Sequence, residues 1–397
     1  MSQPTETTIL ATGLEAVVPA SKTKAVDTRD RIEALDYLRG LLALSVMFYH
    51  YKGWSGLQLG YPLEQVFQRL GVYAVCTFYA LSGTSLGMVY NRRKVNASFL
   101  VEFGIKRIFR IAPLFWTTIT LTILLRWMLM PKLGMGGEGM PTHPLLLAGA
   151  SYSLLFGWVR PDAYVPTGGW SIGVEMVFYS LFPGFLVLMR PSRWRPLLVF
   201  GASVAIGLAF GHFFLDRTIE LGSGEQWPLY INAVNHLFLF VGGMTLALLR
   251  DQNKKASPRW AVAGLPLCAA LFVFWPTQGL GGSVLVTGLE RVLFGGISLA
   301  FCQIALGWPF KFGSLAGLFI WIGNISYAVY LLHPLAADFC SMLNFKILHL
   351  NPLLVSIILS LPLTLICSTL SWIYLEKPLM RLGRRLADKL LPTRSQS

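Results

Sequence analysis

The chain has 397 residues, of which 54% are hydrophobic and only 13% are charged. A soluble domain carries about a quarter charged residues, so this composition excludes an ordinary soluble protein and indicates a polytopic membrane protein. The formal net charge of +14 is concentrated in the loops between apolar stretches, where it serves to orient the chain in the bilayer. The charge therefore does not indicate a nucleic-acid partner.

The two ends of the chain are polar. Residues 1–33 contain no sustained apolar block, which a secretory signal would need after its basic start. We expect 1–33 to be a disordered cytoplasmic tail. The transmembrane domain is expected to cover 34–379, and 380–397 is expected to be a basic cytoplasmic tail.

Ten apolar stretches are long enough to cross a bilayer, which takes roughly 17–25 residues. If every strongly basic loop faces the cytoplasm, the positive-inside rule holds at each alternate loop and both termini are cytoplasmic. An eleventh stretch, 144–158, is shorter, and parity makes it re-entrant or interfacial. The predicted fold is therefore an all-α polytopic membrane protein with about ten transmembrane helices. The predicted spans are 35–51, 70–90, 108–130, 170–189, 196–215, 230–249, 260–276, 281–305, 315–337 and 352–375.

The first span, "LRGLLALSVMFYH" (38–50), is apolar but has a cation and a titratable base at its ends. On a helix, the eleven residues from Arg39 to His50 make just over three turns, so both lie on one stripe, about 16 Å apart. Asp36 lies one turn before Arg39 and can pair with it. Arg39 could instead snorkel to the headgroups, and His50 could cap the helix. Because ionisable groups inside a membrane are functional by default, we favour function for His50 and leave Arg39 open.

The third span opens with "KRIFR" (106–110). Arg107 and Arg110 lie three residues apart and share one helix face, so their planar guanidinium groups suit a diphosphate. The alternative is ordinary positive-inside flanking, which we prefer for Lys106.

The fourth span, which begins "WSIGVEMVFY" (170–179), has a carboxylate about one turn inside its outer end. A buried carboxylate needs a partner, and His50 is a candidate for Glu175 because it lies at a comparable depth. Alternatively, Glu175 accepts hydrogen bonds from a neighbouring helix end.

A structural role is preferred for His333, near the outer end of the ninth span. The histidines and the five cysteines show no metal-ligand or disulfide pattern.

Six stretches, in this order along the chain, resemble acyltransferase family 3. This family comprises integral-membrane proteins that O-acylate bacterial surface glycans and some secreted metabolites. One departure is Tyr79, where the family more often has phenylalanine. The stretches are "LDYLRGLLALSVMFYH" (35–50), "GVYAVCTFYALSG" (71–83), "KRIFRIAPLFW" (106–116), "WSIGVEMVFY" (170–179), "GNISYAVYLLHP" (323–334) and "LEKP" (375–378).

The resemblance implies a bacterial cytoplasmic (inner) membrane protein that uses acyl-CoA, commonly acetyl-CoA, from the cytoplasmic side. No permanently bound cofactor is implied. The acceptor would be a hydroxyl of a polysaccharide, a lipid-linked sugar or a small molecule at the outer side. The main alternative is a transporter or flippase of a lipid-linked glycan, but such folds often show internal repeats, and none is visible here.

The resemblance also implies roles for single residues. His50 would be the catalytic residue, and Arg39, Arg107 and Arg110 would handle the donor. The family motifs also include three positions with less settled roles: Ser82, Glu175 and His333. We expect His50 to act as a general base with Glu175 orienting its ring, while a covalent acyl-histidine remains open.

Overall fold

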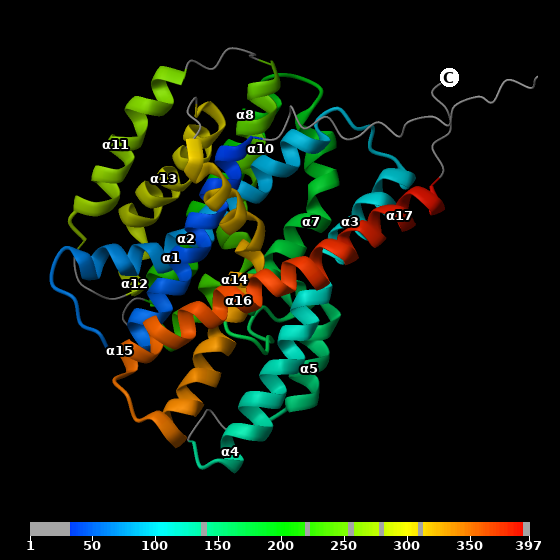
Figure 1. The fold of residues 1–397 in the computed structure, drawn as a ribbon. Coiled ribbons are helices and arrows are strands. Elements are labelled where there is room, and N and C mark those ends of the chain that lie inside the picture. Colours follow the sequence, from blue (N-terminus) through cyan, green and yellow to red (C-terminus); the bar gives the residue numbers. More distant parts are fainter. Residues whose placement is uncertain are drawn as a thin grey trace, which may run out of the picture. The chain divides into compact units, whose positions relative to one another are not determined.

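The structure is a computed structural model that describes residues 32–135, 141–218, 223–252, 258–277, 282–308 and 313–391. Every regular element in these ranges is helical, as predicted. The α-helices (Figure 1) are α1 (Glu33–Trp54), α2 (Leu63–Tyr90), α3 (Ala97–Thr122), α4 (Met130–Lys132), α5 (Pro144–Ser153), α6 (Phe156–Val159), α7 (Gly169–Met189), α8 (Arg195–Phe210), α9 (Ser223–Tyr230), α10 (Ala233–Gln252), α11 (Pro258–Phe274), α12 (Gly282–Leu285), α13 (Gly288–Gly307), α14 (Ala316–Leu343), α15 (Pro352–Leu354), α16 (Leu361–Ser371) and α17 (Lys377–Leu390).

Short π-helical and 3-10 segments extend or join several of these helices. The π-helical segments are η2 (Ile123–Leu129), η3 (Gly211–Leu215), η6 (Asn344–Leu348), η7 (Val355–Ser360) and η8 (Trp372–Glu376). The 3-10 segments are η4 (Asp216–Thr218) and η5 (Gly313–Leu315).

Within the described ranges, eight helices are long and apolar enough to cross a membrane, and each overlaps one of the ten predicted spans. The protein is thus a multi-pass membrane protein. The other two predicted spans, 35–51 and 260–276, are helical as α1 and α11. The first helix carries several charged residues and the second has only 17 residues, so the count of ten and the cytoplasmic termini remain predictions. The eight are Leu63–Tyr90, Ala97–Lys132, Gly169–Met189, Arg195–Thr218, Gln226–Arg250, Gly288–Gly307, Gly313–Leu348 and Pro352–Leu390.

The segment 144–158 is divided into two helices that are each too short to cross a bilayer, so its re-entrant or interfacial place stays a prediction. It forms α5, of 10 residues, and α6, of 4 residues, separated by a left-handed Leu154 with φ 61°. Ten residues of helix span about 15 Å, half of a hydrocarbon core about 30 Å thick. Trp116 of α3 holds this segment by donating its indole N–H to the Tyr152 carbonyl at 2.9 Å.

Glycines let two pairs of helices approach closely. A Cβ added to Gly83 of α2 would overlap the Phe240 carbonyl oxygen of α10, and one added to Gly243 would overlap the Ala80 carbonyl oxygen. In the same way, a Cβ on Gly40 of α1 would come within 2.9 Å of the Gly323 nitrogen of α14. Small residues at such crossings bring backbones together where no hydrophobic force drives helices to associate. The α1–α14 contact sets the position of His50 relative to His333.

Two buried arginines join helices through hydrogen bonds to backbone carbonyls. Arg69 of α2 is fully buried and donates to the Phe272 carbonyl oxygen at 2.6 Å, at the end of α11. Arg291 of α13 donates to the Gly207 carbonyl at 2.7 Å and to the Asn235 carbonyl at 3.0 Å. The last carbonyls of a helix lack intrahelical donors, so Arg69 satisfies a carbonyl in the last turn of α11. Arg291 instead joins α13 to the end of α8 and to the first turn of α10.

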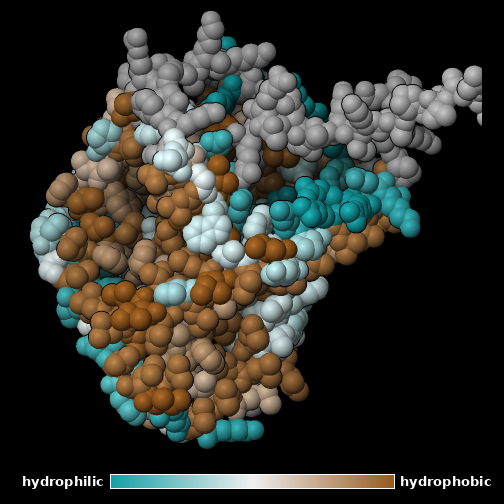
Figure 2. Space-filling view, viewed as in Figure 1, coloured by the Kyte–Doolittle hydropathy of each residue, from teal (hydrophilic) through white to brown (hydrophobic). Residues whose placement is uncertain are grey.

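The C-terminal helix α17 packs against α3, where a Cβ on Gly383 would come within 2.6 Å of the Phe109 Cβ. Figure 1 shows α16 and α17, in orange and red, following one another as an inclined rod. In Figure 2 the hydrophilic surface gathers where α17 ends and α3 begins, while hydrophobic surface covers most of the face below. The predicted boundary between 379 and 380 falls inside α17, and residues 1–31 and 392–397 lie outside the described part of the chain.

Candidate active site

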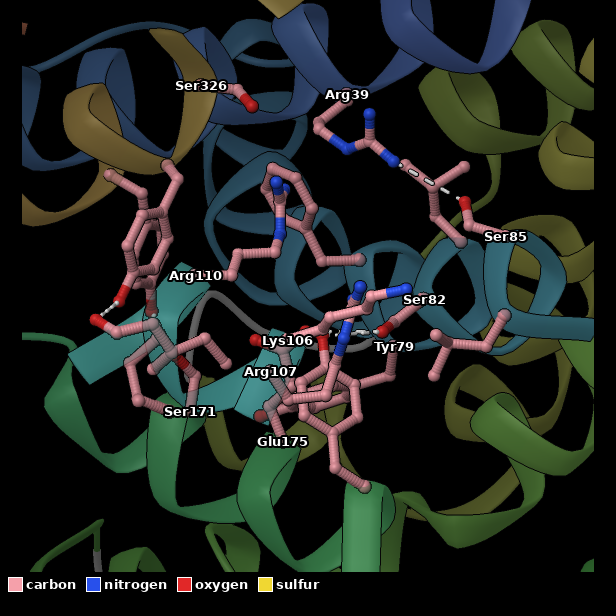
Figure 3. A pocket seen from close by; sticks show the side chains of 18 of the residues that line it. Arg39, Tyr79, Ser82, Ser85, Lys106, Arg107, Arg110, Ser171, Glu175 and Ser326 are labelled. Carbon is pink, nitrogen blue, oxygen red and sulfur yellow. Dashed lines mark hydrogen bonds between the residues drawn. The ribbon is translucent and has the colours of Figure 1, made fainter. Parts of the chain in front are cut away.

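A cavity of about 300 Å³ lies between α1, α2, α3, α7, α14 and α17 (Figure 3), and we name it the basic cavity. It brings together the three predicted donor-handling arginines. Two further cations join them, one of them from the C-terminal helix. The five are Arg39, Lys106, Arg107, Arg110 and Arg384.

Carboxylates balance only part of this charge. Arg39 pairs with Asp36 at 2.8 Å, as predicted, and donates to the Ser85 hydroxyl at 3.4 Å (dashed in Figure 3). Lys106 pairs with Glu102 at 2.5 Å. Among the described residues no carboxylate lies within 4.0 Å of the charged nitrogens of the remaining three, Arg107, Arg110 and Arg384. The basic cavity therefore presents three guanidinium groups outside any such ion pair, against one carboxylate, Glu175, among its lining residues.

Aromatic and sulfur contacts hold two of these arginines in place. The Arg107 guanidinium lies 5.8 Å from the centre of the Phe103 ring and 5.6 Å from that of the Tyr179 ring. The Arg110 side chain lies 3.9 Å from the Met380 sulfur of α17. These contacts orient the guanidinium groups of Arg107 and Arg110 without neutralising their charge.

Glu175 lines the same basic cavity and does not meet His50, so the structure differs from the expected pair. Its carboxylate accepts a hydrogen bond from Ser82 at 3.2 Å and another from the Tyr179 hydroxyl. His50 lines a different cavity. Spacing along one helix gives the depth of a residue, but not which neighbouring helix its side chain faces.

His50 lies in a second cavity of about 820 Å³, which we name the histidine cavity, and in a smaller adjoining one of about 310 Å³. Its Nδ1 is 3.0 Å from Nε2 of His333 on α14, and Nδ1 of His333 is 2.9 Å from the Val329 carbonyl oxygen. The Trp54 ring stacks on His50 with centroids 5.0 Å apart and planes 15° from parallel. His333 is only 1% exposed, so this pair is held rigidly.

The hydrogen bonds fix the tautomers of both neutral rings. A carbonyl oxygen only accepts, so His333 carries its proton on Nδ1 and accepts at Nε2. His50 must then donate from Nδ1. The lone pair of neutral His50 is left on Nε2, where the ring can act as a base.

Arg39 and His50 lie on one face of α1, and each lines a different cavity. Ala43 and Val46, which separate them on that face, are 0% and 1% exposed. The stripe predicted from their spacing therefore runs from the basic cavity to the histidine cavity.

Two side chains, Val75 and Tyr330, line both cavities. The Tyr330 hydroxyl donates to the Gly168 carbonyl at 3.0 Å and lies 2.8 Å from the Ser171 hydroxyl. These two side chains therefore belong to the wall between the cations and the base. Within the described residues no group of three or more potential metal ligands occurs.

The family model described as an acyltransferase domain, that of acyltransferase family 3, matches residues 32–373. The chain belongs to acyltransferase family 3. It is therefore an acyltransferase enzyme, and the resemblance predicted from the motifs is confirmed.

This family 3 acyltransferase is similar in sequence to three curated proteins. It is 28% identical to the exopolysaccharide production protein ExoZ of Rhizobium meliloti, over 79% of this chain and 91% of ExoZ. It is 23% identical to the peptidoglycan O-acetyltransferase OatA of Listeria monocytogenes, over 90% of this chain but 57% of OatA. For the putative peptidoglycan O-acetyltransferase YrhL of Bacillus subtilis the identity is 25%, over 89% of this chain and 56% of YrhL. No solved structure matches the chain.

Sequence reasoning missed three contributors to the two cavities of this acyltransferase. Arg384 belongs to a basic run that topology alone explains, although its place on a helical face was a usable signal. Tyr179 lies one turn after Glu175, which predicts the contact that the structure shows. Tyr330 lies one turn before His333, on the same helix face, but only the fold reveals its place in the wall between the cavities.

Proposed function

We propose that this acyltransferase moves an acyl group, in the simplest case acetyl, from cytoplasmic acyl-CoA to a hydroxyl of an extracytoplasmic glycan. Its place would be the bacterial cytoplasmic membrane. The names of the relatives support this proposal, since ExoZ is a protein of exopolysaccharide production and OatA is an O-acetyltransferase of peptidoglycan.

The observation that carries the proposal is that a cationic cavity and the cavity of His50 share two lining side chains, Val75 and Tyr330. CoA has a diphosphate at one end and a thioester at the end of a long pantetheine arm. The three arginines outside ion pairs outnumber the one carboxylate of the cavity lining and suit the phosphates, because planar guanidinium groups bind phosphate bidentately. Displacement of the Tyr330 ring would let the arm pass from the basic cavity to His50.

His50 then performs the chemistry as a general base. Its Nε2 takes the proton of the acceptor hydroxyl while the oxygen attacks the thioester carbonyl. The carbon–sulfur bond breaks, and the CoA thiolate leaves and receives that proton from His50. Such proton transfer typically contributes about 10²- to 10⁴-fold in rate.

His333 and Glu175 position the reactants. His333 holds the Nδ1 proton of His50, so that the basic nitrogen is always Nε2. Glu175 lies on the donor side with Ser82. A carboxylate there can accept hydrogen bonds from the amide N–H groups of pantetheine, so we assign it to donor binding and not to orienting His50.

The test uses purified protein in liposomes with labelled acetyl-CoA and a glycan acceptor, with release of CoA as the readout. Wild type is expected to release CoA and to label the glycan, whereas His50→Ala is expected to do neither. His212→Ala is the matched control, because that histidine lies on η3 with its side chain 75% exposed. A transporter would move the glycan without releasing CoA, and this result would overturn the proposal.

A further inference from the structure

The histidine cavity contains many aromatic side chains that the transfer step does not use. They come from elements far apart in the sequence: α1, η2, the 160–168 loop, α7 and α9. Five of them are Trp54, Trp127, Tyr164, Trp170 and Trp227. Flat apolar faces of this kind stack on rings.

An interfacial belt accounts for only part of this set. Tryptophans of such a belt lie at the headgroup level, and the exposed fractions of Trp54 and Trp227, 45% and 40%, are compatible with that place. Trp170, in contrast, is 6% exposed, and its ring centre lies 5.6 Å from those of Trp227 and Tyr230. Trp170 is therefore packed into the wall of the cavity, and the belt does not explain it.

An ion pair lies in the same cavity. Nε of Arg126, on η2, is 2.5 Å from Oδ2 of Asp338, on α14. Their side chains are 30% and 19% exposed. Among the described residues this is the only hydrogen bond of either side chain, so both Nη groups of Arg126 and Oδ1 of Asp338 remain available. The pair is neutral overall, yet it offers donors and an acceptor side by side.

A sugar ring matches both the aromatic side chains and the ion pair of this lining. Its hydroxyls each donate and accept hydrogen bonds, and its C–H faces stack on aromatic rings. An apolar alcohol would leave the ion pair unused, and an acyclic polyol would leave the aromatic faces unused. The volume of about 820 Å³ lies in the usual range of ligand sites and far exceeds the needs of an acetyl group.

We propose that the histidine cavity binds a pyranose unit of the acceptor, with the Arg126–Asp338 pair bonding its hydroxyls and the tryptophans stacking on its ring. This inference rests on the proposed acyl transfer, since the bound ring places one hydroxyl at His50. Trp127 is adjacent to Arg126 in sequence and lines the cavity beside it.

The experiment compares acceptor kinetics of full-length variants in liposomes. The donor is labelled acetyl-CoA, and the acceptor is the envelope glycan fraction of the organism from which the sequence comes. The variants are Arg126→Gln, Asp338→Asn and Trp127→Leu, with Arg217→Gln and Trp158→Leu as controls. Arg217, on η4, and Trp158, on α6, are both exposed and do not line the cavity.

We expect Arg126→Gln and Asp338→Asn each to raise the KM for the glycan at least about tenfold, the value of one hydrogen bond to a charged group. Trp127→Leu should also raise this KM, because leucine removes the aromatic face on which the ring stacks. The KM for acetyl-CoA and the acceptor-independent hydrolysis of acetyl-CoA should not change, which also shows that the variant is folded. The controls should behave as wild type. Partial hydrolysis of the product should find the label on a ring hydroxyl.

The outcomes separate the two proposals. A wild type that releases no CoA overturns the acyl transfer itself. A wild type that transfers normally, with an unchanged glycan KM in all three cavity variants, overturns only the pyranose site. Label on a part of the acceptor that contains no sugar ring would overturn it as well.

Discussion

Replacing His333 by leucine tests whether this buried histidine positions His50, the proposed general base. The side chain is 1% exposed, and its Nε2 is 3.0 Å from Nδ1 of His50. Leucine removes the acceptor, so the Nδ1 proton of His50 loses its partner in a partly buried place. An unsatisfied buried donor costs about 1–3 kcal/mol, which corresponds to roughly fivefold to 150-fold in rate. We expect kcat to fall within that range.

The assay varies acetyl-CoA and glycan separately in liposomes and measures the thermal stability of each variant. The KM for acetyl-CoA should stay within about twofold, because His333 does not line the basic cavity. His333→Gln should recover part of kcat, since its amide oxygen can accept from His50. A His333→Leu enzyme with wild-type kcat, or a glutamine variant as slow as the leucine variant, would refute the positioning role.

Three further predictions concern the donor, the packing and the topology. Replacing both Arg107 and Arg110 by lysine should weaken apparent acyl-CoA affinity about tenfold and leave the glycan KM alone, whereas wild-type donor saturation would make both mere topological anchors. Gly243→Val should destabilise the protein by about 1–3 kcal/mol, because the valine side chain meets the α2 backbone. The control is Gly201→Val, at a glycine of α8 with open space around it, and equal melting temperatures for the two variants would contradict the packing account. Leu145 and Leu390 are both exposed, so a cysteine at either position can be labelled in a cysteine-free background. The cysteine at 145 should react with membrane-impermeant reagents and the one at 390 only with permeant ones. The reverse pattern would mean that the predicted orientation is wrong.

Helical geometry explains what could be predicted from the sequence. The shared face of Arg39 and His50 follows from 3.6 residues per turn, and so does the contact of Arg39 with Asp36. The adjacent forks of Arg107 and Arg110 follow in the same way, and both line one cavity. Eight of the ten predicted spans were recovered because a long apolar helix has a strong signal.

Contacts between helices distant in sequence could not be predicted. Depth alone suggested that Glu175 meets His50, but the partner of His50 is His333, which only the α1–α14 packing brings near. Arg126 and Asp338 are isolated charges, 212 residues apart, and no motif joins them. Arg384 was hidden within a basic run that the positive-inside rule already explains.

The central claim is that His50 acts as the base in the transfer of an acyl group from a donor on one side of the membrane to an acceptor on the other. Vectorial transfer in proteoliposomes of uniform orientation tests it most directly, with labelled acetyl-CoA supplied on the α17 side and glycan on the opposite side. We predict labelled glycan from wild type and His212→Ala, and none from His50→Ala. Transfer that requires both substrates on one side, or that persists in His50→Ala, would contradict the claim.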